Sequence, residues 1–118
     1  MAKVFHVITP EEERTRITNS IYHPQSLDNE GFIHFSKADQ IETVIDNFYS
    51  HFQQLILWRV PENKLGEKLV YEPPIEAPNS GIKFPHLYSE MSTHIVEKKF
   101  FLKKNNLGKF LIPSDLLI

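Results

Sequence analysis

The segment Gly31–Ser36, with the sequence GFIHFS, concentrates side chains that could do chemistry. In an extended strand of period two, Phe32, His34 and Ser36 lie on one side. Ser36 is predicted to be the N-cap of the helix that follows, with Asp39 three residues on in a capping box. Unpaired N–H groups at a helix start favour an anion. We therefore predict an anion-binding site beside a histidine that can also exchange a proton near neutral pH.

Two other segments have the same histidine and aromatic character. His6 lies in a predicted first strand, and Phe84–Tyr88 (FPHLY) places His86 after Pro85 and two residues before Tyr88. All three segments fall near the ends of predicted strands or in loops, where a small α+β domain usually carries its site. Each histidine alone is also compatible with a packed, hydrogen-bonded structural residue. The combination of the three is what indicates a functional cleft.

The hydrophobic pattern predicts the elements that position these residues. Residues 3–8 alternate as a strand that directs His6 to one face. A short helix is predicted to begin with Thr9 as its N-cap, with Ile17 and Ile21 facing inward. Further along, the pattern predicts a surface loop at 26–31, an amphipathic core helix at 38–52, a doubly buried strand at 53–60, a partner strand at 68–72, a Pro-rich loop over a pocket at 73–81, and a closing strand at 93–102.

Composition limits the classes of protein to consider. A chain of 118 residues with 41% hydrophobic side chains and this pattern of strands and helices fits one α+β domain. There are no cysteines, which excludes thiolate zinc sites and a cysteine nucleophile. A net charge of −2 provides no basic field for nucleic acid. We expect a cytoplasmic protein that binds neither nucleic acid nor membrane, and the oligomeric state is open.

The sequence resembles the family called domain of unknown function 952. The resemblance rests on FHVITPEE at residues 5–12, GFIHFS at 31–36 and FPHLY at 84–88, in matching order and spacing over roughly residues 3–96. The late motif departs from the family pattern, because Ser89 and Glu90 stand where Gly-Pro is common. We therefore expect a family-like core at residues 3–97 and a C-terminal strand or tail extension at 98–118.

The family's fold is similar to the ADP-ribosyltransferase fold. This likeness implies a small mixed or antiparallel split sheet with two main helices, and a cleft for NAD or an ADP-ribose-like ligand. His6 then matches a histidine that binds the adenosine ribose, while His34 and Phe35 lie near the nicotinamide position. The pattern also needs a glutamate, for which Glu90 and Glu97 are the nearby candidates. The resemblance is to a fold, and a fold hosts many functions.

Three functions remain open from the sequence. The first is a nucleotide- or ADP-ribose-binding cleft, with transferase or hydrolase activity as its catalytic form. Its predicted catalytic residues are His34, His86 and Glu90, and its predicted ligand-binding residues are His6, Thr9, Phe35, Ser36 and Tyr88. The second is a metal site formed by His6, His34 and His86, although no close-spaced ligand pair marks it. The third is a non-catalytic module that binds a protein or peptide through an aromatic patch.

Overall fold

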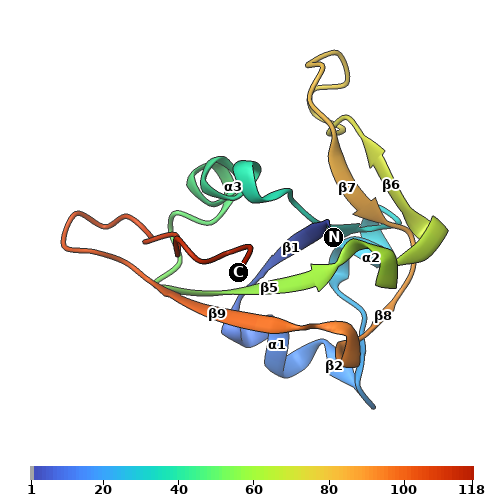
Figure 1. Ribbon diagram of the computed structural model, residues 1–118, viewed down its shortest axis with the longest axis horizontal. Coiled ribbons are helices and arrows are strands. Elements are labelled where there is room, and N and C mark those ends of the chain that lie inside the picture. The colour runs from blue at the N-terminus through green and yellow to red at the C-terminus, as the bar shows by residue number, and fades with distance from the viewer. Residues whose placement is uncertain (1) are drawn as a thin grey trace.

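The computed structural model describes residues 2–118, whose strands form three antiparallel sheets of three strands each (Figure 1). The strands are β1 (Lys3–Ile8), β2 (Ile17–Thr18), β3 (Ile21–Tyr22), β4 (Ile33–His34), β5 (Gln54–Pro61), β6 (Leu69–Glu72), β7 (Phe84–Leu87), β8 (Met91–Ser92) and β9 (Lys98–Lys103). The α-helices are α1 (Pro10–Thr15), α2 (Gln25–Asn29) and α3 (Ile41–Phe48), and short 3₁₀ turns lie at Ala38–Gln40, Glu62–Lys64, Gly66–Lys68 and Thr93–Ile95. The predicted α+β class is confirmed.

The central sheet has the strand order β1–β5–β9, with His6 of β1 opposite Trp58 of β5. Alternate residues of β5 enter different hydrophobic clusters, since Leu57 packs with the α3 side of the sheet and Trp58 with the other side. Both faces are therefore buried, as the apolar run at 53–60 predicted. With both faces buried, β5 is the central strand of the fold and packs against both hydrophobic clusters.

The chain after β1 begins as predicted and then differs. Thr9 is the N-cap of α1, and its hydroxyl accepts from the backbone N–H of Glu12 at 3.1 Å. The expected helical pair Ile17 and Ile21 is wrong, because these residues lie in the β2–β3 hairpin. Asn19 and Ser20 between them have φ angles of 53° and 63°, as two-residue hairpin turns require. Since α1 buries none of its residues, packing gives the helix no reason to extend.

The sheet β4–β7–β6 carries the two histidines of the central and late motifs. His34 of β4 lies directly opposite His86 of β7 in the antiparallel register. Of the strand predicted at 31–36, only Ile33–His34 form a regular strand. Ser36, at the end of the predicted strand, pairs with β1 instead. Phe5 and Ser36 exchange two backbone hydrogen bonds of 2.8 and 2.7 Å. This bridge ties the histidine-bearing sheet to the edge of the central sheet.

The expectation that Ser36 caps the next helix is wrong. That helix begins with the 3₁₀ turn Ala38–Gln40, whose N-cap is Lys37 and whose cap hydrogen bond is Lys37 N–H to the Gln40 side chain at 2.9 Å. The backbone N–H of Ser36 is already bonded to Phe5, so it belongs to a strand bridge rather than to a helix start. The prediction of an anion site at this helix terminus loses its geometric basis.

Two further expectations are corrected. The residues predicted as a surface loop at 26–31 include most of α2, and Gly31 then turns with φ 90°. Strand β6 pairs with β7 and not with β5. The 3₁₀ turns at Glu62–Lys64 and Gly66–Lys68 occupy the connection, so the chain leaves the central sheet instead of folding back beside β5.

The C-terminal segment is part of the central sheet and its packing. Strand β9 pairs with β5 over six residues, and Phe110 bridges to Lys104 after the turn. Phe110 and Leu116 are buried in the α3-side cluster, while Arg59 donates to the Leu116 carbonyl at 3.1 Å. Across residues 2–118, no helix is long and apolar enough to cross a membrane.

Candidate functional site

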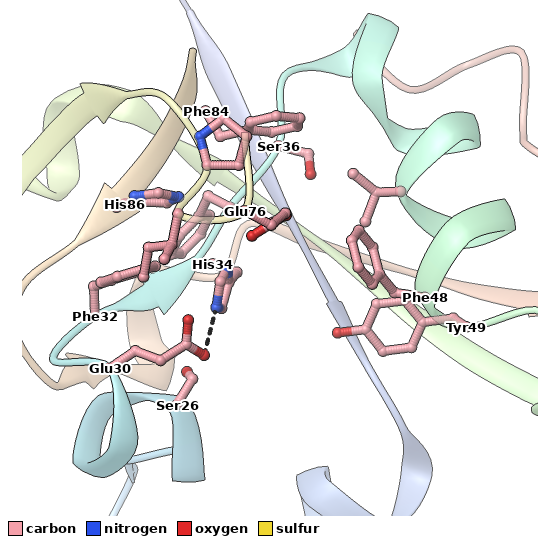
Figure 2. Close-up of a pocket in the computed structure, with 14 residues that line it drawn as sticks. Ser26, Glu30, Phe32, His34, Ser36, Phe48, Tyr49, Glu76, Phe84 and His86 are labelled. Carbon is pink, nitrogen blue, oxygen red and sulfur yellow. Dashed lines mark hydrogen bonds and ion pairs between the residues drawn. The ribbon is translucent and has the colours of Figure 1, made fainter. Parts of the chain in front are cut away.

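A pocket of about 430 Å³ opens between β4, β7, α3 and the Pro-rich loop (Figure 2). This volume lies in the range of small-molecule sites. The loop predicted to lie over a pocket contributes to the lining, as expected. The lining residues are Ser26, Glu30, Phe32, His34, Phe35, Ser36, Val44, Phe48, Tyr49, Pro74, Ile75, Glu76, Phe84 and His86.

The strand pairing brings His34 and His86 to the same pocket. Their ring centroids are 5.5 Å apart, with an angle of 76° between the planes. His34 Nε2–H donates to the Glu30 carboxylate at 3.0 Å, and Figure 2 shows these two side chains meeting at the pocket wall. About half of the His34 side chain is exposed, whereas that of His86 is 3% exposed. One imidazole is therefore at the mouth and the other is deep in the wall.

Glu72 orients His86 from behind the pocket. A carboxylate accepts, so His86 Nδ1–H donates to Glu72 Oε1, at 2.8 Å. Burial lowers the pKa of His86 and keeps the ring neutral at pH 7, with its lone pair on Nε2. The Tyr88 hydroxyl also donates to Glu72. Tyr88 and His86 together lower the pKa of Glu72, and the carboxylate raises the pKa of Tyr88 to about 12.

His86 Nε2 has no hydrogen-bond partner among the described residues. The ring stacks on Phe32 at a centroid distance of 4.0 Å and an interplanar angle of 20°, which fixes its plane. Among residues 2–118, no fully buried side-chain nitrogen lacks a hydrogen-bond partner, so the unpaired Nε2 retains some accessible surface. His86 is one of the residues that line the pocket. Nε2 is therefore an oriented hydrogen-bond acceptor and a base.

His6 lies outside the pocket lining and inside the core. Its Nδ1–H donates to the His34 carbonyl at 2.6 Å, and its Nε2 accepts from the Tyr22 hydroxyl at 2.6 Å. Burial lowers the pKa of His6 to about 4 and raises that of Tyr22. Both ring nitrogens are thus used within the protein. The structure places His6 behind β4, where it supports the backbone of the strand that carries His34.

The other predicted site residues divide between the pocket and its surroundings. Phe35 and Ser36 line the pocket. Tyr88 reaches it indirectly through Glu72, and Thr9 caps α1. Glu90 lies elsewhere, with a carboxylate oxygen 2.7 Å from His23 Nδ1.

Glu90 and Glu97, the two glutamates that the sequence suggested for the site, form hydrogen bonds with basic side chains. His23 also donates to Asp28 at 2.7 Å. Donation from both ring nitrogens requires the imidazolium, and the hydrogen bonds to Asp28 and Glu90 raise the pKa of His23. Glu97 accepts from Lys3 at 2.9 Å and from Arg59 at 2.6 Å. The structure thus gives Glu90 and Glu97 ion-pair partners away from the pocket.

Several residues that line the pocket or support it from behind were not identified from the sequence. Glu72 lies in a strand whose partner was mispredicted, and Phe48 was read as core although its side chain is 55% exposed. Glu30 carried one usable signal, namely its position four residues before His34. Glu76 lies in the Pro-rich loop, where local pattern indicates no orientation.

The histidines do not assemble a metal site. Within the part of the chain that the structure describes, no group of three or more His, Asp or Glu side chains is arranged to hold a metal ion. His6 has both nitrogens engaged, and Nδ1 of His86 and Nε2 of His34 are bonded to glutamates. The proposed three-histidine ligand set is therefore not formed.

Comparison with known proteins identifies the family. A family profile described as "Protein of unknown function (DUF952)" matches residues 7–99. This chain belongs to the DUF952 family. The match ends within β9, so the C-terminal tail of this DUF952 protein lies beyond it. No curated protein matches the chain.

Solved structures similar to this DUF952 protein share its fold over the whole chain. A crystal structure of protein CC0527 from Caulobacter crescentus is 22% identical, with a TM-score of 0.82 over 98% of this chain and 99% of that one. A solution NMR structure of CC0527 is 24% identical, with a TM-score of 0.74 over 92% and 91%. At this identity the likeness shows the fold alone. Neither description mentions ADP-ribosylation, so that fold expectation rests on the sequence resemblance only.

Proposed function

We propose that this DUF952 protein binds a small molecule with a flat ring in the pocket between β4, β7 and α3. The ring of a nucleotide- or ADP-ribose-like compound is the first candidate. The observation that carries the proposal is the His86 ring, which lines the pocket, has no protein partner at Nε2 among residues 2–118 and is held in one orientation by Glu72 and Phe32. Aromatic side chains around it supply the apolar surface on which a planar ring can stack.

The size and polarity of the pocket support one ring system. About 430 Å³ accommodates a nucleobase or a nucleoside but not a whole dinucleotide. Phe48, the last residue of α3, and Tyr49, which follows it, face Phe32 and His34 across the space, as Figure 2 shows. A ring between these walls would meet aromatic faces on both sides and the His86 acceptor at its edge. The phosphates of a nucleotide-like ligand would extend from the open mouth.

A thermal-shift series tests this proposal with adenine, adenosine, AMP, ADP-ribose and NAD as probes. A ligand at about ten times its Kd stabilises the native state by about 1.4 kcal/mol, which raises Tm by roughly 6 °C in a domain of this size. We expect at least one probe to produce this shift. We expect His86→Ala to remove it, and His94→Ala, at an exposed histidine outside the lining, to retain it. Absence of any shift across the series contradicts the proposal.

Acid–base catalysis is a second candidate that one observation favours. The Glu72–His86 pair keeps the His86 lone pair on Nε2, so His86 could take a proton from a water or hydroxyl as that oxygen forms a bond to an electrophilic atom of the ligand. The bond from that atom to its leaving group would break, and His86 would return the proton to the leaving group. This is the transferase or hydrolase form of the same site. ¹H NMR spectra of the probes during incubation with the protein would reveal turnover, and His86→Ala should abolish it.

A further inference from the structure

We infer that the pocket selects positively charged or amine-bearing rings and rejects anionic ones. This inference rests on the proposed function, because it names the ligand class that the same pocket would take. It follows from the kinds of polar atom in the lining. Glu30 and Glu76 contribute carboxylates, which only accept hydrogen bonds, and the neutral His86 ring has its free lone pair on Nε2. The lining also includes residues with a hydroxyl group, which can donate or accept but carries no positive charge: Ser26, Ser36 and Tyr49.

The lining lacks compensating cations. Among the described residues, no lysine or arginine lines the pocket. Lys37 and Lys83 are chain neighbours of lining residues but are not themselves in the lining. An anionic group inside would therefore face carboxylates and an imidazole lone pair without a basic side chain to pair with. An N–H donor would find acceptors on several sides.

The aromatic walls favour the same ligand class. Phe32, Phe35, Phe48, Tyr49 and Phe84 all line the pocket. The negative face of an aromatic ring attracts a cation, an effect that carboxylates on the same wall reinforce. Figure 2 shows Glu76 extending from the Pro-rich loop toward the space between His34 and the α3 side chains. An ammonium or amidinium group there could contact Glu76 while its ring lies against the aromatic walls.

Applied to the nucleotide-like candidates, this polarity specifies an orientation. The amino-bearing edge of the base would enter toward His86, and the phosphates would remain outside. A nucleoside should then bind at least as well as its 5′-monophosphate. The anionic character that the sequence suggested for the ligand would belong to the part of it that the pocket leaves in solvent.

Three planar probes of similar size and different charge test the inference: benzylamine as the cation, benzyl alcohol as the neutral form and sodium benzoate as the anion. Binding to the full chain is measured by ¹H–¹⁵N NMR titration at pH 7. We expect the cation to bind most tightly and the anion least. Equal affinities, a preference for benzoate or no binding of benzylamine overturn the inference.

Two glutamate variants assign the preference to the pocket. Glu76→Gln removes one charge from an exposed loop residue and should weaken benzylamine binding about threefold to fivefold, while leaving benzyl alcohol unchanged. Glu30→Gln should act in the same direction. Glu67→Gln, at an exposed glutamate outside the lining, is the matched control and should have no effect. An equal loss in Glu67→Gln would mean that net charge, and not the pocket, selects the cation.

The two proposals can fail separately. If the nucleoside series produces no thermal shift but benzylamine binds and responds to Glu76→Gln, the charge selection stands and the nucleotide-like ligand is wrong. If AMP binds more tightly than adenosine and Glu76→Gln does not strengthen AMP binding, the pocket binds a nucleotide and the inferred charge selection is wrong.

Discussion

His6 lies in the core region and His86 lies in the pocket region, and one strand separates them. The two histidines differ in how many of their ring nitrogens have partners within the protein. Both residues are almost fully buried, with exposed fractions of 6% and 3%. In the core region, His6 uses both ring nitrogens inside the protein. In the pocket region, His86 uses Nδ1 for Glu72, and its Nε2 has no partner among the described residues. Burial alone does not distinguish a structural histidine from a chemical one, whereas the partners of its nitrogens do.

The two regions are connected through His34. Its backbone carbonyl accepts the hydrogen bond from His6, while its side chain lines the pocket and pairs with Glu30. His6 therefore stabilises the backbone of β4, the strand whose His34 side chain lines the pocket. We expect variants on the core side to change stability first and variants on the pocket side to change binding first.

The largest expected difference is in unfolding free energy after truncation of each histidine. His6→Ala deletes two buried hydrogen bonds and leaves a cavity beside Tyr22 and Trp58, so we expect a loss of about 4 kcal/mol. His86→Ala enlarges an existing pocket and should cost only about 1 kcal/mol. Urea denaturation measures both, with His94→Ala as the control. Equal losses of unfolding free energy in His6→Ala and His86→Ala would contradict the distinction between the core region and the pocket region.

Acidification should also act through the core histidine. The pKa of His6 is about 4 in the folded state and about 6.5 in the unfolded chain, so the unfolded state takes up the proton first. The contribution of His6 is complete above pH 6.5 and is lost as pH falls toward 4, by about 3 kcal/mol. The lowered pKa of His86 acts in the same direction.

The measurement compares the free energy of unfolding as a function of pH for the wild-type protein and His6→Gln. The substitution removes the titration of His6, while the carboxylates titrate in both proteins. The difference between the two profiles should narrow as pH falls from 6.5 to 4. An NMR titration of the His6 ring in the wild-type protein is independent of the variant. A His6 pKa near 6.5 would contradict the assignment.

The smallest expected effect is electrostatic and confined to the pocket region. Glu72→Gln removes the charge that favours protonation of His86, so the pKa of His86 should fall further. The pKa of Tyr88 should fall from about 12 toward 10. NMR titration of both rings measures these changes, and His6 should titrate as before. A rise in the His86 pKa would show that Glu72 does not orient this ring through Nδ1.

Elements with strong local patterns were predicted well. The alternation of residues 3–8, the cap at Thr9 and the apolar run before Val60 each mark one element, and all three were confirmed. Short elements held by distant partners were mispredicted. The β2–β3 hairpin pairs with β8, and β6 pairs with β7, in registers that no local pattern indicates.

The candidate site shows the same division. His34 and His86 were identified because aromatic and histidine residues cluster around each of them in the sequence. Glu72 was missed because its contact with His86 depends on the β6–β7 pairing. His6 was grouped with the pocket histidines because a strand pattern defines the face of a side chain but not what covers that face.

The amino-acid sequence by itself determined the α+β class, the main buried strands, the first helix start and the pair of histidines that line the pocket, because period, capping and composition are local properties. The tertiary structure decided which histidine nitrogens are paired within the protein and that His86 Nε2 is not. Those pairings join residues such as His6 with Tyr22 and His86 with Glu72, whose contacts exist only once the chain is folded and the strands are in register.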